Sequence, residues 1–182
     1  MKPLGLGWPN VVSILRAMLV PAVVLLILAE ERTAMYLAAL LFVVGALTDG
    51  LDGYLARRHG MTTRTGQWLD PLSDKLFVSA PIVTLTLLDR FPLWAAVVII
   101  AREIAVSLLR AYLGSRRASM PASNIAKWKT ASQIAAVTLY LLPLTGGLVQ
   151  VRFAVLWLAV GLTIYSGLDY FLRARRLAST VS

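Results

Sequence analysis

Six apolar segments of about 20 residues, separated by short polar stretches, constrain this chain more than any other feature. A helix of about 20 apolar residues has the length needed to cross the hydrocarbon core of a bilayer. The chain is 58% hydrophobic, above the roughly 45–50% of soluble domains, and its 182 residues suit one domain. We therefore predict an all-α integral membrane protein, a single domain over residues 1–182. Its six transmembrane helices cover about 10–29, 34–57, 70–89, 92–113, 127–145 and 150–172.

The basic residues indicate how these helices are oriented, and the net charge of the chain is +9. If the termini and the loops near 57–69 and 114–129 share one side, that side holds Lys2, Arg57, Arg58, Arg64, Arg116, Arg117, Lys127, Lys129, Arg173, Arg175 and Arg176. The other side receives Arg32, Arg90 and Arg152. The positive-inside rule then places both termini in the cytoplasm. The basic excess fits anionic membrane lipids as partners. It does not indicate nucleic acid, because no soluble domain would present it.

Four aspartates lie where the second predicted helix ends and the third begins. Asp49 and Asp52 are spaced i, i+3, and Asp70 and Asp74 are spaced i, i+4, so each pair shares a helical face. Carboxylates at the edge of a hydrocarbon layer are costly and usually functional. Their hard oxygen ligands suit Mg²⁺ or Mn²⁺, and two divalent cations would offset four negative charges. Paired metals of this kind stabilise the attacking and leaving oxygens in displacement at phosphorus.

Each part of this pattern also has an alternative interpretation. Gly53 and Ala56 could be small helix-packing residues. Asp70 could cap a helix before Pro71, and the aspartates of the second helix could pair with the arginines that follow them. A small cation transporter could use the acids as an ion site, although they lie near the ends of their helices rather than at the midplane. Together, the packing, capping and ion-pair alternatives explain the four acids poorly, because no matching set of buried cations accompanies them, so we favour a metal site.

The spacing D-x2-D-G-x2-A-R-x8-G-x3-D-x3-D resembles the signature of the CDP-alcohol phosphotransferases, integral membrane enzymes of phospholipid synthesis. All eight positions are matched, by Asp49, Asp52, Gly53, Ala56, Arg57, Gly66, Asp70 and Asp74. The resemblance implies transfer of a phosphatidyl group from CDP-diacylglycerol to an alcohol, with release of CMP. It also implies a location in the cytoplasmic (inner) membrane, an active site that faces the cytoplasm, and a homodimer, since family members are often dimers.

The resemblance assigns roles to individual residues. Two divalent cations, Mg²⁺ or Mn²⁺, would be held by Asp49, Asp52, Asp70 and Asp74. Asp74 would be the catalytic base that accepts the proton of the acceptor hydroxyl. CDP would be bound by Asp52, Gly53, Ala56, Arg57 and Gly66.

Stretches outside the signature resemble the branch of the family that makes phosphatidylglycerophosphate from sn-glycerol 3-phosphate. They are residues 70–75, 101–104, 109–110 and 127–130, together with Pro9, Asn10, Ser13, Arg16 and Pro21 of the first predicted helix. The acceptor phosphate would be bound by Lys75, Arg102, Arg110, Lys127 and Lys129. Arg102 could equally form an internal ion pair with Glu103, and Ala126 replaces a glycine usual in that branch. Phosphatidylglycerol (giving cardiolipin) or an inositol phosphate remain alternative acceptors.

Other polar residues inside the predicted helices suit interhelical hydrogen bonds. These are Gln133, Thr138, Thr163, Ser166 and Asp169. Asp169 could instead pair with a basic residue of the cluster at 173–176.

Overall fold

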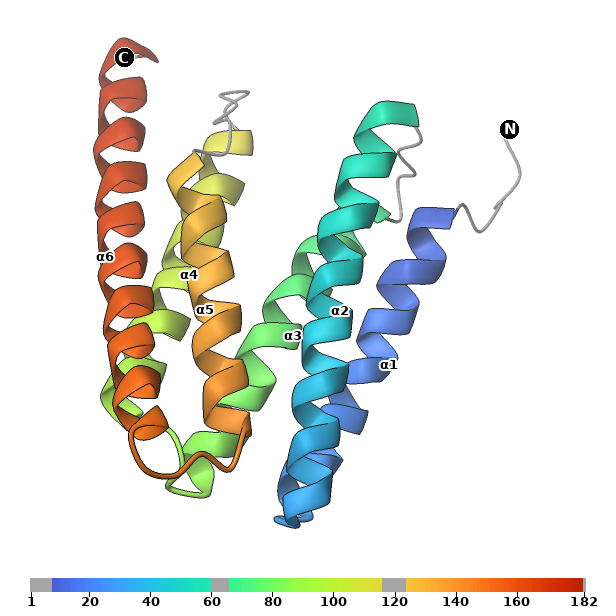
Figure 1. The fold of residues 1–182 in the computed structure, drawn as a ribbon. Helices are drawn as coiled ribbons and strands as arrows, with labels where there is room; N and C mark the ends of the chain where they lie inside the picture. Colours follow the sequence, from blue (N-terminus) through green and yellow to red (C-terminus); the bar gives the residue numbers. More distant parts are fainter. Residues whose placement is uncertain (1–7, 60–65, 116–123, 182) are drawn as a thin grey trace. The chain divides into compact units, whose positions relative to one another are not determined.

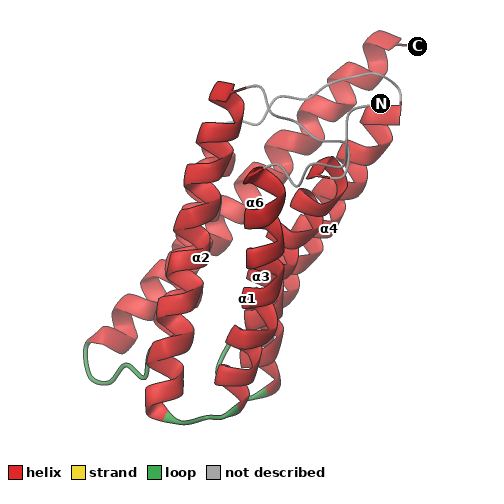
Figure 2. Cartoon of the chain, turned by 90° about the vertical axis from the view of Figure 1, so that its right-hand side faces the viewer, coloured by secondary structure: helices red, strands yellow, loops and turns green. Residues whose placement is uncertain are grey.

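The structure, a computed structural model, forms six α-helices over the residues that it describes. It describes the backbone of residues 8–59, 66–115 and 124–181 and the side chains of residues 18–48, 75–113, 125 and 127–175. No strand occurs in these ranges, as Figure 2 shows. The helices are α1 (Trp8–Leu28), α2 (Arg32–His59), α3 (Gly66–Leu87), α4 (Leu93–Ser115), α5 (Asn124–Leu141) and α6 (Leu148–Val181). The predicted all-α class is confirmed, and each predicted span corresponds to one helix. Four basic residues of the charge count lie outside the described residues: Lys2, Arg64, Arg116 and Arg117.

One helix of the described part is both long and apolar enough to cross a membrane. It is the segment Leu148–Arg175 of α6, with a mean hydropathy of 1.8. Only 22% of its most apolar window is buried inside the protein, whereas the core helix of a soluble protein would be mostly buried. Shorter apolar helical segments are Met18–Leu28, Arg32–Thr48 and Lys75–Leu87. The membrane crossing of all six helices stays a prediction.

The first of two compact units contains α1, α2, α3 and the last residues of α5. In this unit α1 packs against both α2 and α3 (Figure 1). Its core includes Val23, Ile27, Ile82 and Leu85, whose side chains are fully buried. Burial of such side chains is worth about 1.5–3 kcal/mol each in water. This packing fixes α2 and α3, the helices that carry the aspartates.

The loops that follow α1 and α3 are joined by an ion pair in the same unit. Nη2 of Arg90 donates a hydrogen bond to Oε2 of Glu30 at 3.1 Å, and both side chains are well exposed. Glu30 adopts a left-handed backbone conformation, with φ of 55°. Exposed ion pairs contribute about 0–1 kcal/mol, so this one adds little to stability.

The second compact unit contains α4, the first part of α5 and α6. Here α4 packs against α6 (Figure 1). The apolar core includes Ile99, Leu156 and Ala159, which are buried. The same unit also buries polar side chains, namely Lys129, Ser132, Gln133, Thr163 and Ser166. An interior that holds a lysine and several hydroxyl groups requires an explanation beyond packing.

Candidate functional site

The four aspartates lie on two helices of the first unit. Asp49 and Asp52 belong to α2, and Asp70 and Asp74 belong to α3. Because both segments are helical, each pair shares one helical face, as predicted. The side chains of all four lie outside the described residues, so metal coordination stays a prediction. The side chains that are described contain no group of three His, Cys, Asp or Glu residues that could hold a metal ion.

The aspartate-bearing faces of α2 and α3 continue into residues whose contacts are described. Phe42 and Gly45 precede Asp49 by seven and four residues, which places them on its face of α2. On α3, Phe77 follows Asp74 by three residues. The rings of Phe42 and Phe77 stack with their centroids 5.0 Å apart, and a Cβ added at Gly45 would lie 2.5 Å from Cζ of Phe77. The two faces are therefore turned toward each other one to two helical turns from Asp49 and one turn from Asp74.

The predicted CDP contacts lie on the same two helices: Asp52, Gly53, Ala56 and Arg57 in α2, and Gly66 as the first residue of α3. Their side chains are also outside the described set, so their contacts with CDP stay a prediction. Asp70 lies four residues inside α3, with helix on both sides of it. The alternative that Asp70 caps the helix before Pro71 is therefore wrong.

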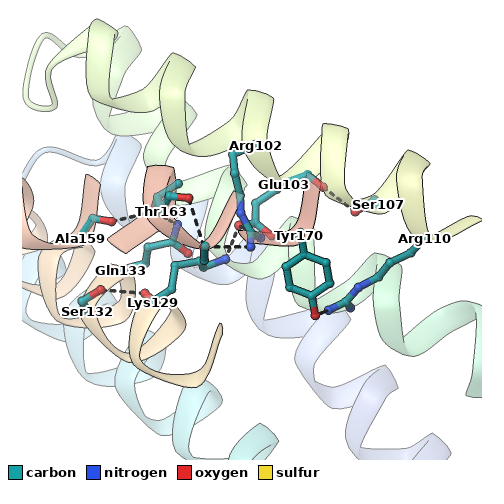
Figure 3. A network of polar contacts seen from close by, with 11 residues as sticks. Arg102, Glu103, Ser107, Arg110, Lys129, Ser132, Gln133, Ala159, Thr163 and Tyr170 are labelled. Carbon is teal, nitrogen blue, oxygen red and sulfur yellow. Dashed lines mark hydrogen bonds and ion pairs between the residues drawn. The ribbon is translucent and has the colours of Figure 1, made fainter. Parts of the chain in front are cut away.

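The second unit contains a buried ion-pair network built from α4 and α5 (Figure 3). Nη1 of Arg102 donates to Oε1 of Glu103 at 3.2 Å, and Nζ of Lys129 donates to the same oxygen. The side chains of Lys129, Arg102 and Glu103 are only 5%, 11% and 19% exposed. Buried charges are tolerated when they are paired. Glu103 therefore holds two of the predicted phosphate-binding cations, and the alternative ion pair of Arg102 with Glu103 is confirmed.

Arg110 joins this network through α6. Its Nη2 donates a hydrogen bond to the hydroxyl of Tyr170, and its guanidinium lies 4.8 Å from the centroid of the tyrosine ring. Arg102 lies 5.8 Å from the same centroid and donates from Nη2 to Oγ of Ser166 at 3.0 Å. We call Arg102, Glu103, Arg110 and Lys129 the cation cluster. Three cations and one carboxylate give it a formal charge of +2.

One hydrogen bond between α5 and α6 and two within α6 belong to the same unit as the cation cluster. Nε2 of Gln133 donates to Oγ1 of Thr163 at 2.9 Å, and Oγ of Ser166 donates to the carbonyl of Thr163 at 3.1 Å. Asp169 accepts a hydrogen bond from Nε of Arg173 at 2.8 Å. The predicted roles of Gln133 and Thr163 as interhelical partners, and of Asp169 as a partner of the basic cluster, are confirmed.

The other two predicted phosphate contacts are not among the residues of this network. Lys127 is exposed on α5, and Lys75 lies on α3, which belongs to the first unit. The second unit thus brings together three of the five predicted cations: Arg102, Arg110 and Lys129.

The sequence interpretation did not include Tyr170, which contacts both arginines of the cation cluster. A signal for it exists in the sequence. Thr163, Ser166 and Tyr170 are spaced i, i+3, i+7, so they form a polar stripe along one face of an otherwise apolar helix. All three side chains are buried. In a helix that can cross a membrane, such a stripe marks the face turned toward other helices.

Similarity to known proteins covers most of the chain. The CDP-alcohol phosphatidyltransferase family matches residues 6–165. A protein of Rickettsia typhi is 37% identical over 167 residues, which cover 90% of this chain and 94% of that protein. A protein of Bacillus subtilis is 39% identical over 178 residues, which cover 90% of this chain and 92% of that protein. A protein of Pseudomonas fluorescens is 38% identical over 170 residues, which cover 89% of this chain and 87% of that protein. All three are named CDP-diacylglycerol–glycerol-3-phosphate 3-phosphatidyltransferase. The chain therefore belongs to the CDP-alcohol phosphatidyltransferase family, whose members are membrane-associated enzymes.

Proposed function

We propose that this enzyme transfers a phosphatidyl group from CDP-diacylglycerol to sn-glycerol 3-phosphate, which gives phosphatidylglycerophosphate and CMP. The observation that carries the proposal is the similarity to relatives named for this reaction over 89–90% of the chain. The aspartates of α2 and α3 and the cation cluster of the second unit supply the chemical groups that the reaction needs.

The donor set of α2 and α3 fits two divalent cations, Mg²⁺ or Mn²⁺. Its members are Asp49, Asp52, Asp70 and Asp74. Carboxylate oxygens are preferred ligands of these ions, and the facing contact of Phe42 with Phe77 supports an arrangement in which both aspartate pairs serve one site. Bound there, the cations would stabilise the negative charge of the diphosphate leaving group.

The transfer itself needs one base and one leaving group. The acceptor hydroxyl oxygen forms a bond to the phosphorus that carries diacylglycerol, and the bond from that phosphorus to the oxygen of CMP breaks. Asp74 accepts the proton of the attacking hydroxyl. Asp52, Gly53, Ala56, Arg57 and Gly66 bind the CDP moiety. In this set Arg57 supplies N–H donors to phosphate oxygens, and the glycines permit close approach of the backbone.

The cation cluster supports a phosphorylated acceptor. A phosphate monoester carries a charge of about −1.5 to −2 at pH 7. The formal charge of +2 on Arg102, Glu103, Arg110 and Lys129 would neutralise such a group. Lys127 of the same unit is proposed as a further phosphate contact, while the role of Lys75, which lies on α3 of the first unit, stays a prediction. A neutral acceptor such as glycerol would leave the positive charge of the cluster without compensation, so the cluster favours glycerol 3-phosphate over an alcohol without phosphate.

The enzyme would work as a six-span protein of the cytoplasmic membrane, with both termini and the active site on the cytoplasmic side, and as a homodimer. Support for a lipid environment comes from large apolar side chains exposed on all six helices. They include Leu25, Leu40, Leu87, Leu108, Trp128 and Phe171, each at least 59% exposed. Exposed apolar surface of this extent is typical of membrane contact.

The test is release of CMP from CDP-diacylglycerol by the purified protein in detergent, with one acceptor at a time. We expect release with glycerol 3-phosphate and none with glycerol, phosphatidylglycerol or an inositol phosphate. Removal of divalent cations with EDTA should abolish release, and Mg²⁺ or Mn²⁺ should restore it. Turnover of a different acceptor would overturn the assignment of glycerol 3-phosphate, while activity that persists in EDTA would overturn the metal site.

A further inference from the structure

Tyr170 occupies a position on α6 that packing alone does not account for. The residue is 2% exposed, yet its hydroxyl group accepts a hydrogen bond from Arg110, a residue of α4. Figure 3 shows the tyrosine ring beside both Arg102 and Arg110. The two guanidinium carbons lie 5.8 Å and 4.8 Å from the ring centroid, within the range of cation–π attraction. One aromatic ring therefore contacts two cations of the cluster.

Residues of α6 next to Tyr170 in the helix hold the side chain of Arg102 in place. Ser166 accepts a hydrogen bond from Arg102, and a Cβ added at Gly167 would lie 3.2 Å from Cγ of Arg102. Gly167 thus leaves room for the stem of Arg102, while Ser166 and Tyr170 contact its head group. Residues 166, 167 and 170 form one surface of α6 that holds both arginines in place.

Arg110 needs such support more than Arg102 does. Arg110 is exposed, and its flexible side chain ends in a guanidinium that carries five N–H donors. An arginine side chain has about 2 kcal/mol of rotamer entropy, which is lost when an anion binds to a free side chain. Tyr170 uses one donor of Arg110 and orders the stem, so other donors are available in a fixed geometry. Such ordering before binding raises affinity.

We propose that Tyr170 is a positioning residue for the acceptor. Its hydroxyl group holds the guanidinium of Arg110, and its ring face holds the guanidinium of Arg102, in the geometry that binds the acceptor phosphate. The inference rests on the proposed function, because it assigns Arg110 to that phosphate. It predicts that substitution of Tyr170 changes the KM for the acceptor but not the KM for CDP-diacylglycerol, since the donor contacts are assigned to α2 and α3. If the tyrosine served only to pack α6, its substitution would change the KM values of both substrates or of neither.

The first test is Tyr170→Phe, which keeps the ring and removes the hydroxyl. Loss of a hydrogen bond to a charged group corresponds to about a tenfold change or more. We expect the KM for glycerol 3-phosphate to rise about tenfold, with the KM for CDP-diacylglycerol unchanged. Tyr170→Leu, which also removes the ring, should raise the acceptor KM further. Tyr140→Phe is the matched control, since Tyr140 is a buried tyrosine, 3% exposed, to which no role toward either substrate is assigned; its acceptor KM should stay at the wild-type value.

The second test asks whether Tyr170 acts through Arg110. In an Arg110→Ala background, Tyr170→Phe should cause no further rise in the acceptor KM. Multiplied effects of the two substitutions would overturn the inference, as would a wild-type acceptor KM in Tyr170→Phe or equal rises for both substrates. If Tyr170→Phe does not fold, Arg110→Lys replaces it. That variant keeps the charge but loses the planar fork, so it should raise the acceptor KM, and a wild-type value would overturn the inference.

The experiments distinguish an error in the proposed function from an error in the proposed role of Tyr170. If the wild-type enzyme turns over another phosphorylated acceptor and not glycerol 3-phosphate, the proposed acceptor is wrong, and the same double-mutant cycle with that acceptor still decides the role of Tyr170. If glycerol 3-phosphate is the acceptor and Arg110→Ala raises its KM while Tyr170→Phe does not, the proposed function stands and the role of Tyr170 is wrong.

Discussion

At the scale of single residues, Glu103 determines whether the cation cluster can exist inside the protein. It is the carboxylate that both Lys129 and Arg102 contact, and those two side chains are almost entirely buried. Removal of one partner from a buried ion pair leaves a charge without compensation, which is far costlier than loss of an exposed pair. Glu103 therefore has a structural task that precedes any contact with substrate.

We expect Glu103→Gln to lower the free energy of unfolding by about 3 kcal/mol, because Lys129 and Arg102 lose their counter-charge. The measurement is the midpoint of thermal unfolding of the purified protein in detergent. Glu30→Gln is the matched control, since Glu30 pairs with Arg90 where the side chains are 52% and 36% exposed. Its cost should be at most about 1 kcal/mol. Equal midpoints for the two variants would show that burial of the network contributes nothing.

Asp74 carries the second prediction at this scale. Asp74→Asn keeps the size of the side chain and one oxygen but cannot accept a proton, so we expect kcat to fall by about 10²–10⁴-fold. The measurement is release of CMP at saturating CDP-diacylglycerol and glycerol 3-phosphate. Asp89→Asn, at an exposed acid outside the signature, should keep the wild-type kcat. A kcat near wild type in Asp74→Asn would remove Asp74 from the role of base.

At the scale of helices, α2 and α3 both pack against α1, and the side chain of Phe77 brings one face of α3 against Phe42 and Gly45 of α2. Gly45 is the residue that permits this contact, since the ring of Phe77 occupies the space where a Cβ would project. The stacked ring of Phe42 closes the same contact from one turn away. Displacement of α3 at this point would be transmitted along the helix to Asp74 and Asp70, which lie one and two turns from Phe77.

Gly45→Ala should therefore reduce both stability and activity. Overpacking a well-packed contact costs about 1–3 kcal/mol, and we expect kcat to fall with it because the acids move apart. Gly161→Ala is the control, since nothing lies within 4 Å of a Cβ at that helical position. There alanine should stabilise the helix by up to about 1 kcal/mol. Gly45→Ala with Phe77→Leu should recover stability; failure to recover it would place the cause elsewhere.

The helices could be predicted from sequence more fully than the contacts between them. Runs of apolar residues place all six helices to within a few residues of most of their ends, because an apolar run of this length favours a helix. Helix α6 continues to Val181, beyond the predicted end near 172, since its charged last turns no longer match an apolar pattern. Spacing also indicated the aspartate pairs. The partnership of Tyr170 with Arg110 could not be predicted, because it joins residues 60 positions apart.

At the scale of the whole molecule, the residues proposed for the two chemical tasks belong to different compact units. The aspartates and the proposed CDP contacts belong to the first unit, and the cation cluster belongs to the second. Helix α5 contributes to both, since residues 124–136 lie in the second unit and residues 137–141 in the first. If the proposed donor and acceptor contacts are right, substitutions in one unit should change the KM of one substrate more than that of the other.

The proposed topology can be tested directly because the chain contains no cysteine. A single introduced cysteine is then the sole thiol available to a reagent that cannot cross membranes. With six spans and cytoplasmic termini, the α1–α2 and α5–α6 loops face outward. In intact cells, we expect labelling of Glu31→Cys and Thr145→Cys but not of Arg175→Cys, which should react only after permeabilisation. The unsubstituted chain is the control for background labelling. Reaction of Arg175→Cys in intact cells would reverse the orientation and place the aspartate-bearing ends of α2 and α3 outside, where they could not meet a cytoplasmic supply of glycerol 3-phosphate.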